Sequence, residues 1–162
     1  LPNLVERGVS SLMRVATSRD MKLDFKNTAG NITMNLDDTK LRQVVMNYID
    51  NAMYYSKAGT TIHITLQKTE TDLVLKVKDT GIGVPESEQA RLFEKFFRAT
   101  NARKQRPDGT GVGLFLAKKV ITAFGGDVVF ESKHGKGSTF GFRLPLKQDE
   151  KLLLKHSAKQ FK

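Results

Sequence analysis

The chain has 162 residues, 39% of them hydrophobic, which is enough for one domain with a real core, and no apolar run in it is long enough to span a membrane. Its lack of cysteine excludes disulfides and thiolate metal sites and fits a reducing compartment. The formal net charge of +10 calls for an anionic partner, but no stripe of basic residues interleaved with aromatics favours nucleic acid.

Hydrophobic spacing divides the chain into alternating helices and strands. In order, the pattern predicts a helix over 4–16, strands over 21–26 and 32–36, a helix over 41–52, strands over 62–66 and 73–77, a short helical stretch from Pro85 to Phe97, a helix over 111–124, and strands over 128–132 and 138–144. Asp37 or Asp38 is the expected N-cap of the second long helix, and Gly125 follows the end of the third. This order predicts an α+β two-layer sandwich, with one mixed, mostly antiparallel sheet covered by about three helices.

Two segments lie outside this pattern. Residues Arg98 to Thr110 are polar and basic, with nothing to anchor a core, and a loop of that length in a compact domain is usually disordered or functional, often a lid. Beyond Pro145 the chain is basic again, so we expect one domain over 1–146 and a tail or linker over 147–162. Because the chain opens with Leu1 rather than Met, we expect a fragment, with any membrane anchor of its parent outside it.

Two asparagines form the first candidate site. Asn47 and Asn51 are four residues apart on the second long helix, so their side chains sit one above the other beside its apolar stripe, with Tyr55 between the two rows. Amides at the edge of a core are costly unless something polar meets them. A pair of this kind is also found as simple capping or core-edge amides.

A second candidate group follows the strand over 73–77. Asp79 stands at the strand end and is followed by Gly81 and Gly83, which let backbone approach a flat ligand closely. A carboxylate there can accept a hydrogen bond from an exocyclic amine. Adenine offers that amine at its six-position whereas guanine offers an oxygen, so Asp79 would select ATP over GTP. Taken alone, the pattern is also that of an ordinary turn.

The third group is the glycine-rich segment Gly109 to Gly113, which runs straight into a helix. Backbone N–H groups at a helix N-terminus are a ready anion site, and glycines keep Cβ atoms out of the way. The segment follows no predicted strand and has no GK[ST] ending, so neither the dinucleotide fingerprint nor the P-loop applies. By itself it is as typical of a hinge as of a phosphate cradle.

The order of the motifs is more specific than any one of them. NxxxN, DxGxG, FxxFF followed by Arg98, GTGVGL and the segment GKGSTF from Gly135 to Phe140 occur in one chain. The sequence thereby resembles the catalytic ATP-binding domain of bacterial sensor histidine kinases. These domains belong to the larger Bergerat-fold group that includes gyrase B, mismatch-repair ATPases and heat-shock chaperones. The resemblance covers Leu4 to Leu146.

The resemblance implies roles at the phosphate end of a bound ATP. Asn51 would hold Mg²⁺ through its side-chain oxygen, a hard ligand that suits this cation, and Asn47 would lie close to the phosphates. Arg98 would reach the terminal phosphate, and the three glycines of the third group would let a lid close. Asn47, Asn51 and Arg98 are therefore the implied catalytic residues.

At the base end, Asp79 would bond the adenine amine with support from Thr139, and Tyr55 and Ile82 would flank the ring. The complete nucleotide-binding set implied by the resemblance is Asn47, Asn51, Tyr55, Asp79, Gly81, Ile82, Gly83, Arg98, Gly109, Thr110, Gly111, Gly113, Leu114 and Thr139.

One residue departs from the family pattern. Tyr54 stands where the family often has a lysine that contacts phosphate. Losing that lysine removes one positive contact, for which Arg103, Lys104 or Arg106 of the polar loop would compensate. The departure leaves nucleotide affinity open, more than nucleotide identity.

The ATPase branches of the group carry a glutamate four residues ahead of the metal-binding asparagine, where it acts as general base. Here that position is Asn47, which cannot take a proton, so we expect slow hydrolysis and another phosphoryl acceptor. His63, His134 and His156 do not fit a phosphoacceptor on a dimerisation helix. The acceptor is therefore expected on a separate domain.

The implied function is that of half an enzyme in two-component signal transduction. The chain would bind Mg-ATP and donate the γ-phosphoryl to a histidine on a dimerisation domain, and act only indirectly on a response regulator. We expect a cytoplasmic, monomeric fragment of a membrane-anchored sensor, without nucleic acid or direct membrane contact. Two alternatives stay open, a nucleotide-binding scaffold without phosphotransfer and a fragment of a gyrase-type or repair ATPase.

Overall fold

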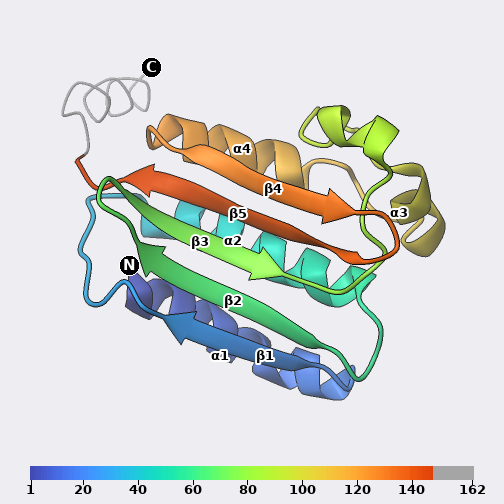
Figure 1. Ribbon diagram of the computed structural model, residues 1–162, viewed down its shortest axis with the longest axis horizontal. Helices are drawn as coiled ribbons and strands as arrows, with labels where there is room; N and C mark the ends of the chain where they lie inside the picture. The colour runs from blue at the N-terminus through green and yellow to red at the C-terminus, as the bar shows by residue number, and fades with distance from the viewer. Residues whose placement is uncertain (148–162) are drawn as a thin grey trace.

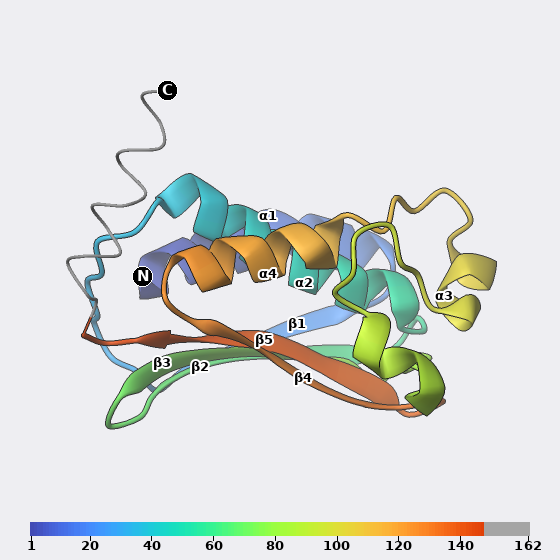
Figure 2. The same cartoon turned by 90° about the horizontal axis from the view of Figure 1, so that it is seen from above.

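The computed structural model describes residues 1–147, so the predicted tail over 147–162 lies, apart from its first residue, outside the described part of the chain. The described residues form two layers, with one sheet and three long helices packed on one of its faces (Figures 1 and 2). This confirms the predicted α+β sandwich. Among residues 1–147, none of the helices has the length and apolar character needed to cross a membrane.

The three long helices are α1 (Pro2–Ser18), α2 (Asp38–Tyr55) and α4 (Gly113–Ala123), and two short ones, η1 (Glu86–Arg91) and α3 (Thr100–Gln105), lie between β3 and α4 in the chain. The predicted N-cap of α2 is confirmed, because the Asp37 carboxylate accepts a hydrogen bond of 3.0 Å from the Lys40 backbone N–H. Gly125, with φ of 76°, follows the end of α4 in the left-handed conformation that glycine adopts at little cost.

The sheet has five strands in the order β1-β2-β3-β5-β4. Their bounds are β1 (Lys22–Asn27), β2 (Thr61–Lys68), β3 (Asp72–Lys78), β4 (Asp127–Lys133) and β5 (Gly137–Pro145). Strand β1 pairs with β2 in parallel, with α2 in the crossover between them, and the remaining pairs are antiparallel. Both predicted hairpins, β2–β3 and β4–β5, are therefore confirmed.

Helix α2 is the centre of the core because it lies between α1 and α4 and packs on the sheet. Its buried residues are Leu41, Val44, Val45, Tyr48, Ile49, Ala52 and Met53. The alternate residues of β2 and β3 that face it are almost fully buried, namely Ile62, Ile64, Leu66, Leu73, Leu75 and Val77. This packing fixes the rotation of α2 about its axis, and it leaves Asn47 and Asn51 at the edge of the core.

The predicted strand over 32–36 is wrong. Ile32, Met34 and Leu36 do pack against the core while the residues between them are exposed, which explains the alternation in the sequence. No neighbouring strand offers backbone partners to this segment, and Ile32 O instead accepts a hydrogen bond of 2.8 Å from the N-terminal amino group of Leu1. Alternating burial alone does not make a strand, because a ladder needs a partner.

The segment after β3 also differs from expectation. Helix η1 ends at Arg91, and Phe96 has a positive φ of 66° and 64% exposure, so it is not a core residue. The polar loop over 98–110, called the lid from here on, contains the short helix α3 and is not structureless. Figures 1 and 2 show the lid at one end of the sheet, beside the start of α4.

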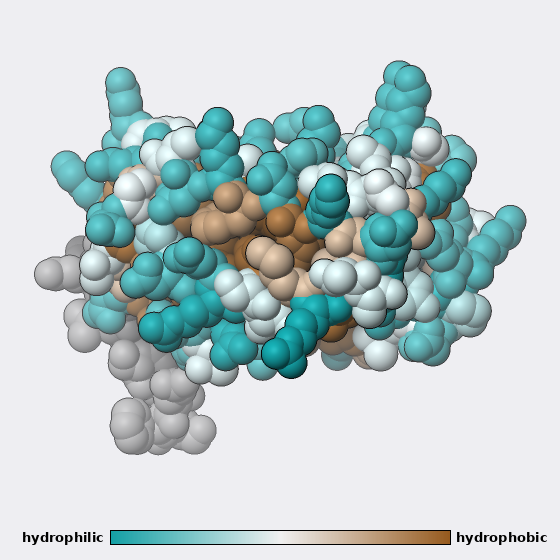
Figure 3. All heavy atoms as spheres, turned by 90° about the horizontal axis from the view of Figure 1, so that it is seen from below, coloured by the Kyte–Doolittle hydropathy of each residue, from teal (hydrophilic) through white to brown (hydrophobic). Residues whose placement is uncertain are grey.

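Apolar side chains gather on the face that carries α1 and β1 (Figure 3). The partly buried apolar residues of these two elements include Leu12, Leu23 and Phe25, which pack against the core. This patch lies at the β1 edge of the sheet.

The hydroxyl of Tyr48 offers a test of this packing. The side chain is fully buried, its ring stacks on that of Phe140 with centroids 6.1 Å apart, and its hydroxyl has no hydrogen-bond partner among the described residues. Burial raises its pKa. Replacing Tyr48→Phe removes a buried polar group that is not paired, so we expect the free energy of unfolding to stay equal or rise by about 1 kcal/mol in denaturant titrations. A clear loss of stability would mean that the hydroxyl has a partner.

Candidate functional site

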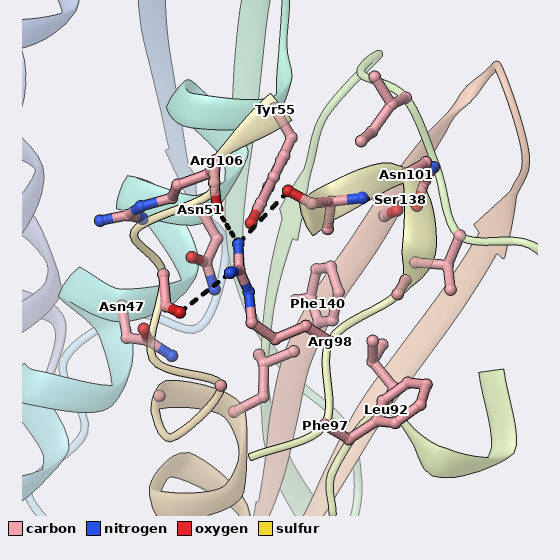
Figure 4. A pocket seen from close by; sticks show the side chains of 18 of the residues that line it. Asn47, Asn51, Tyr55, Leu92, Phe97, Arg98, Asn101, Arg106, Ser138 and Phe140 are labelled. Atoms are coloured by element: carbon pink, nitrogen blue, oxygen red, sulfur yellow. Dashed lines mark hydrogen bonds between the residues drawn. The ribbon is translucent and has the colours of Figure 1, made fainter. Parts of the chain in front are cut away.

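A cavity of about 250 Å³ opens between the C-terminal half of α2, the loop after β3, the lid, the start of α4 and the start of β5 (Figure 4). It brings together residues that are far apart in the sequence. All the predicted site residues line it except Gly81 and Thr139. The two ends of the cavity differ in chemistry, with a buried carboxylate at one end and amides and glycines at the other.

Asp79 forms the buried end. Only 5% of its surface is exposed, and its Oδ1 accepts hydrogen bonds from the backbone N–H groups of Gly81 (2.8 Å) and Ser138 (3.2 Å). Burial raises the pKa of this carboxyl group, against the lowering effect of the two hydrogen bonds. Within residues 1–147 no cation pairs with it and Oδ2 accepts no hydrogen bond, so this oxygen is available to a donor in the cavity.

The two glycines after Asp79 are required by the packing of the loop itself. A Cβ on Gly81 would lie 2.3 Å from the carbonyl oxygen of Tyr55, and one on Gly83 would lie 2.2 Å from that of Lys133. The loop is therefore pressed between the end of α2 and the end of β4. Gly81 does not line the cavity and acts by holding Asp79 in place, whereas Gly83 does line it.

The prediction that Thr139 supports Asp79 is wrong by one residue. Side chains of a strand alternate between its faces, and in β5 Ser138 and Phe140 line the cavity while Thr139 faces the other side. It is the backbone of Ser138 that donates to Asp79. The sequence contained the signal, because Ser138 shares the parity of the buried residues Phe140 and Phe142.

The other end of the cavity is polar. The side chains of Asn47 and Asn51 line it, as predicted (Figure 4). Nδ2 of Asn47 is buried without a hydrogen-bond partner among the described residues, and its Oδ1 lies against Gly113, where a Cβ would come within 2.4 Å. An orphaned amide donor fits an anionic oxygen of a ligand.

The N-terminus of α4 adds backbone donors to this end. The helix has no side-chain N-cap, so its first N–H groups are not satisfied from within its own sequence. Gly111 has a φ of 70°, and Gly113 leaves just enough room for Asn47. Together the helix end and the amide row place N–H donors around this end of the cavity, an arrangement that suits an anion.

A metal ion would need help from a ligand here. Residues 1–147 contain no group of three or more His, Cys, Asp or Glu side chains that could hold one. The amide oxygen of Asn51 suits Mg²⁺, which keeps waters and takes most of its protein contacts together with phosphate oxygens. The residues present therefore fit Mg²⁺ bound with a polyphosphate, and they do not fit a metal held by protein alone.

Arg98 lines the cavity but its guanidinium is occupied. It donates hydrogen bonds to the carbonyl oxygens of Gly109 (2.9 Å), Ala102 (3.4 Å) and Arg106, which Figure 4 shows. It also donates to the carbonyl oxygen of Pro107 (3.2 Å). Gly109 lies so close to it that a Cβ there would come within 2.6 Å of Nη2. In this structure Arg98 organises the lid from inside, a role that its sequence position does not reveal.

Several lining residues were not anticipated. They are Asp50, Val84, Leu92, Phe97, Ala99, Asn101, Ala102, Asp108, Ser138 and Phe140. Most belong to the lid and its approach, where no periodic pattern assigns a facing direction. Of the three basic residues expected to compensate for the missing lysine, Arg106 lines the cavity, whereas Arg103 and Lys104 do not.

Comparisons with known proteins agree with this geometry. The family described as histidine kinase-, DNA gyrase B-, and HSP90-like ATPases matches residues 36–148. Sensor histidine kinase WalK of Bacillus subtilis (strain 168) is 40% identical over 119 residues, covering 72% of this chain and 20% of WalK. Sensor protein SrrB of Staphylococcus aureus is 34% identical over 137 residues, covering 77% of this chain and 24% of SrrB. The chain thus spans a quarter or less of these relatives.

Solved structures are similar over nearly the whole chain. Full-length ShkA in complex with AMPPNP has a TM-score of 0.77 and 26% identity, covering 91% of this chain and 30% of ShkA. The nucleotide-free catalytic domain of histidine kinase ThkA has a TM-score of 0.77 over 89% of this chain and 92% of that catalytic domain, and at 23% identity it shows the fold alone. The chain therefore belongs to the family of histidine kinase-, DNA gyrase B- and HSP90-like ATPases, and within it to the ATP-binding catalytic domains of sensor histidine kinases.

Proposed function

We propose that this chain binds Mg-ATP and presents its γ-phosphoryl group to a histidine on a separate dimerisation domain. The observation that carries the proposal is Asp79, a buried carboxylate whose second oxygen faces a cavity that ends in unpaired amide and backbone donors. One end suits a purine amine and the other suits phosphates. In the parent protein the phosphoryl would then pass to a response regulator.

At the base end, Asp79 accepts a hydrogen bond from the six-amino group of adenine, and Tyr55 and Ile82 contact the ring. Phe140 lines the cavity and stacks on the buried ring of Tyr48. Guanine presents an oxygen at the same position, which would face a carboxylate oxygen without a proton between them. The site therefore selects adenine.

At the phosphate end, the amide Nδ2 of Asn47 and the first N–H groups of α4 donate to phosphate oxygens, and Asn51 offers its amide oxygen to Mg²⁺. When bound, Mg²⁺ neutralises charge on the phosphates. The chain's own contribution is to position the γ-phosphoryl and to stabilise charge, which supplies most of the catalysis in phosphoryl transfer. Asn47 cannot act as a base, so water is a poor acceptor.

Exchanging Asp79→Asn separates binding from folding. The asparagine keeps an oxygen for the N–H groups of Gly81 and Ser138, but turns an NH₂ donor toward the adenine amine. We expect ATP affinity to fall about ten- to hundredfold, the equivalent of a lost charge-assisted bond, in calorimetric titrations with Mg²⁺. The exposed Asp127→Asn is the control. Unchanged ATP affinity in the Asp79 variant would refute the adenine assignment.

The raised pKa of Asp79 gives two pH effects of defined sign. Its ionised form is disfavoured in the folded chain, so this group contributes fully to stability at low pH and that contribution is lost as pH rises from the unfolded toward the folded pKa. Without ligand, the Asp79→Asn variant should therefore be at least as stable as the parent at neutral pH in thermal unfolding. ATP binding should weaken as pH falls through the raised pKa, and the variant should lack that dependence.

Phosphotransfer distinguishes the proposal from its alternatives. Alone with labelled Mg-ATP, the domain should release phosphate slowly, and label should appear on a histidine-bearing dimerisation domain of the same family added in trans. Brisk hydrolysis by the isolated domain would favour a gyrase-type ATPase. Binding without transfer to any dimerisation domain, including its own, would favour the scaffold, which the occupied guanidinium of Arg98 and the missing lysine at Tyr54 motivate.

A further inference from the structure

The lid is fastened on both sides of the cavity. On one side Asn101 donates a hydrogen bond of 2.8 Å from Nδ2 to the carbonyl oxygen of Gly83. On the other side, two consecutive lid residues contact Tyr54 of α2. Gln105 donates from Nε2 to the Tyr54 carbonyl oxygen (2.9 Å), and Cζ of Arg106 lies 4.4 Å from the centroid of the Tyr54 ring. Helix α3 therefore bridges the cavity mouth.

The ring of Tyr54 is the main support of the Arg106 guanidinium. Nε of Arg106 is buried and has no hydrogen-bond partner among the described residues. Arg106 forms an ion pair with Asp50, whose Oδ2 lies 3.9 Å from Nη1, and the side chains of Asp50 and Arg106 are 44% and 28% exposed. An ion pair of that length and exposure contributes little, whereas a cation stacked on the partly buried ring of Tyr54 gains a cation–π contact. In Figure 4, Arg106 extends away from Arg98 on the Asn51 side of the cavity.

A lysine at position 54 would not fit this arrangement. Besides Arg106, Arg19 of the loop after α1 approaches the same ring, with Cζ 5.6 Å from its centroid. An ammonium group in place of the ring would stand beside both guanidinium groups. Like charges at these distances repel, so a lysine at position 54 is disfavoured beside Arg106 and Arg19, whereas a tyrosine ring attracts both.

We propose that Tyr54 and Arg106 form a latch that holds the lid across the cavity mouth before any nucleotide arrives. Both are positioning residues. The latch takes the place of the phosphate contact that a lysine on α2 would supply. Nucleotide release is then limited by opening of the lid, and not by the breaking of a contact between α2 and a phosphate. The role of the latch in nucleotide release rests on the proposed function, whereas the latch itself does not.

Hydrogen exchange on the nucleotide-free chain tests the latch directly. We expect Tyr54→Ala and Arg106→Ala each to speed exchange of the amides of α3 about three- to tenfold, because each removes the same stacking contact. In the double variant the effects should not multiply. Lys104→Ala, which removes a charge from the same helix, is the matched control. Tyr54→Phe should keep the protection, and Tyr54→Lys should lose it.

The proposal fails if exchange of α3 in both alanine variants equals that of Lys104→Ala, or if Tyr54→Phe behaves like Tyr54→Ala. Retention is tested separately, from the dissociation rate of a fluorescent N-methylanthraniloyl-ATP with Mg²⁺. The alanine variants should release it faster by the same factor as their exchange increases. Faster exchange of α3 with an unaltered dissociation rate would support the latch and refute its role in retaining nucleotide. If no variant bound the nucleotide at all, that result would refute the proposed function and not the latch.

Discussion

The structure depends on a buried carboxylate held at the point where three elements meet. Asp79 directly follows β3. Its Oδ1 accepts hydrogen bonds from the N–H of Ser138 at the start of β5 and from the N–H of Gly81, whose backbone lies against the end of α2. These contacts fix the position of the second oxygen to within the tolerance of a hydrogen bond. Burial makes the charge costly, so the arrangement is explained better by a ligand than by stability.

The lid adds a second constraint of a different kind. Arg98 gathers the carbonyl oxygens of the lid from inside, and Tyr54 receives Arg106 from outside. Among the described residues, Arg98 forms no ion pair and Arg106 forms only a long one with Asp50, at 3.9 Å. In this chain the charges of the lid therefore shape the lid first. We propose that this is how a domain without the usual lysine closes over an anionic ligand.

Much of the fold and half of the site follow from local sequence. The apolar row of α2 dictates which face is buried, and the row of Asn47 and Asn51 follows from the helical repeat alone. The position of Asp79 at a strand end is equally local. The strand over 32–36 failed because alternation reports burial and does not report whether a pairing partner exists. The error at Thr139 came from matching a motif without using the parity of β5.

The segment 98–110 was expected to be a functional loop, but the contacts that hold the lid could not be predicted from the sequence. The partners of Arg98 are carbonyl oxygens, which every residue has, and the partner of Arg106 is more than fifty positions away along the chain. The sequence predicted that Gly81 and Gly83 let a ligand approach the backbone. In the structure they let the backbone carbonyl groups of Tyr55 and Lys133 approach instead. Long-range contacts of this kind leave no periodic signal in one sequence.

The most direct test of the account is a crystal structure of this chain with a non-hydrolysable ATP analogue and Mg²⁺. The account predicts the six-amino group of adenine within hydrogen-bond distance of the Asp79 carboxylate, with the phosphates at Asn47 and the first turn of α4. An adenine ring bound elsewhere, or a cavity that stays closed to the analogue at saturating concentration, would contradict it.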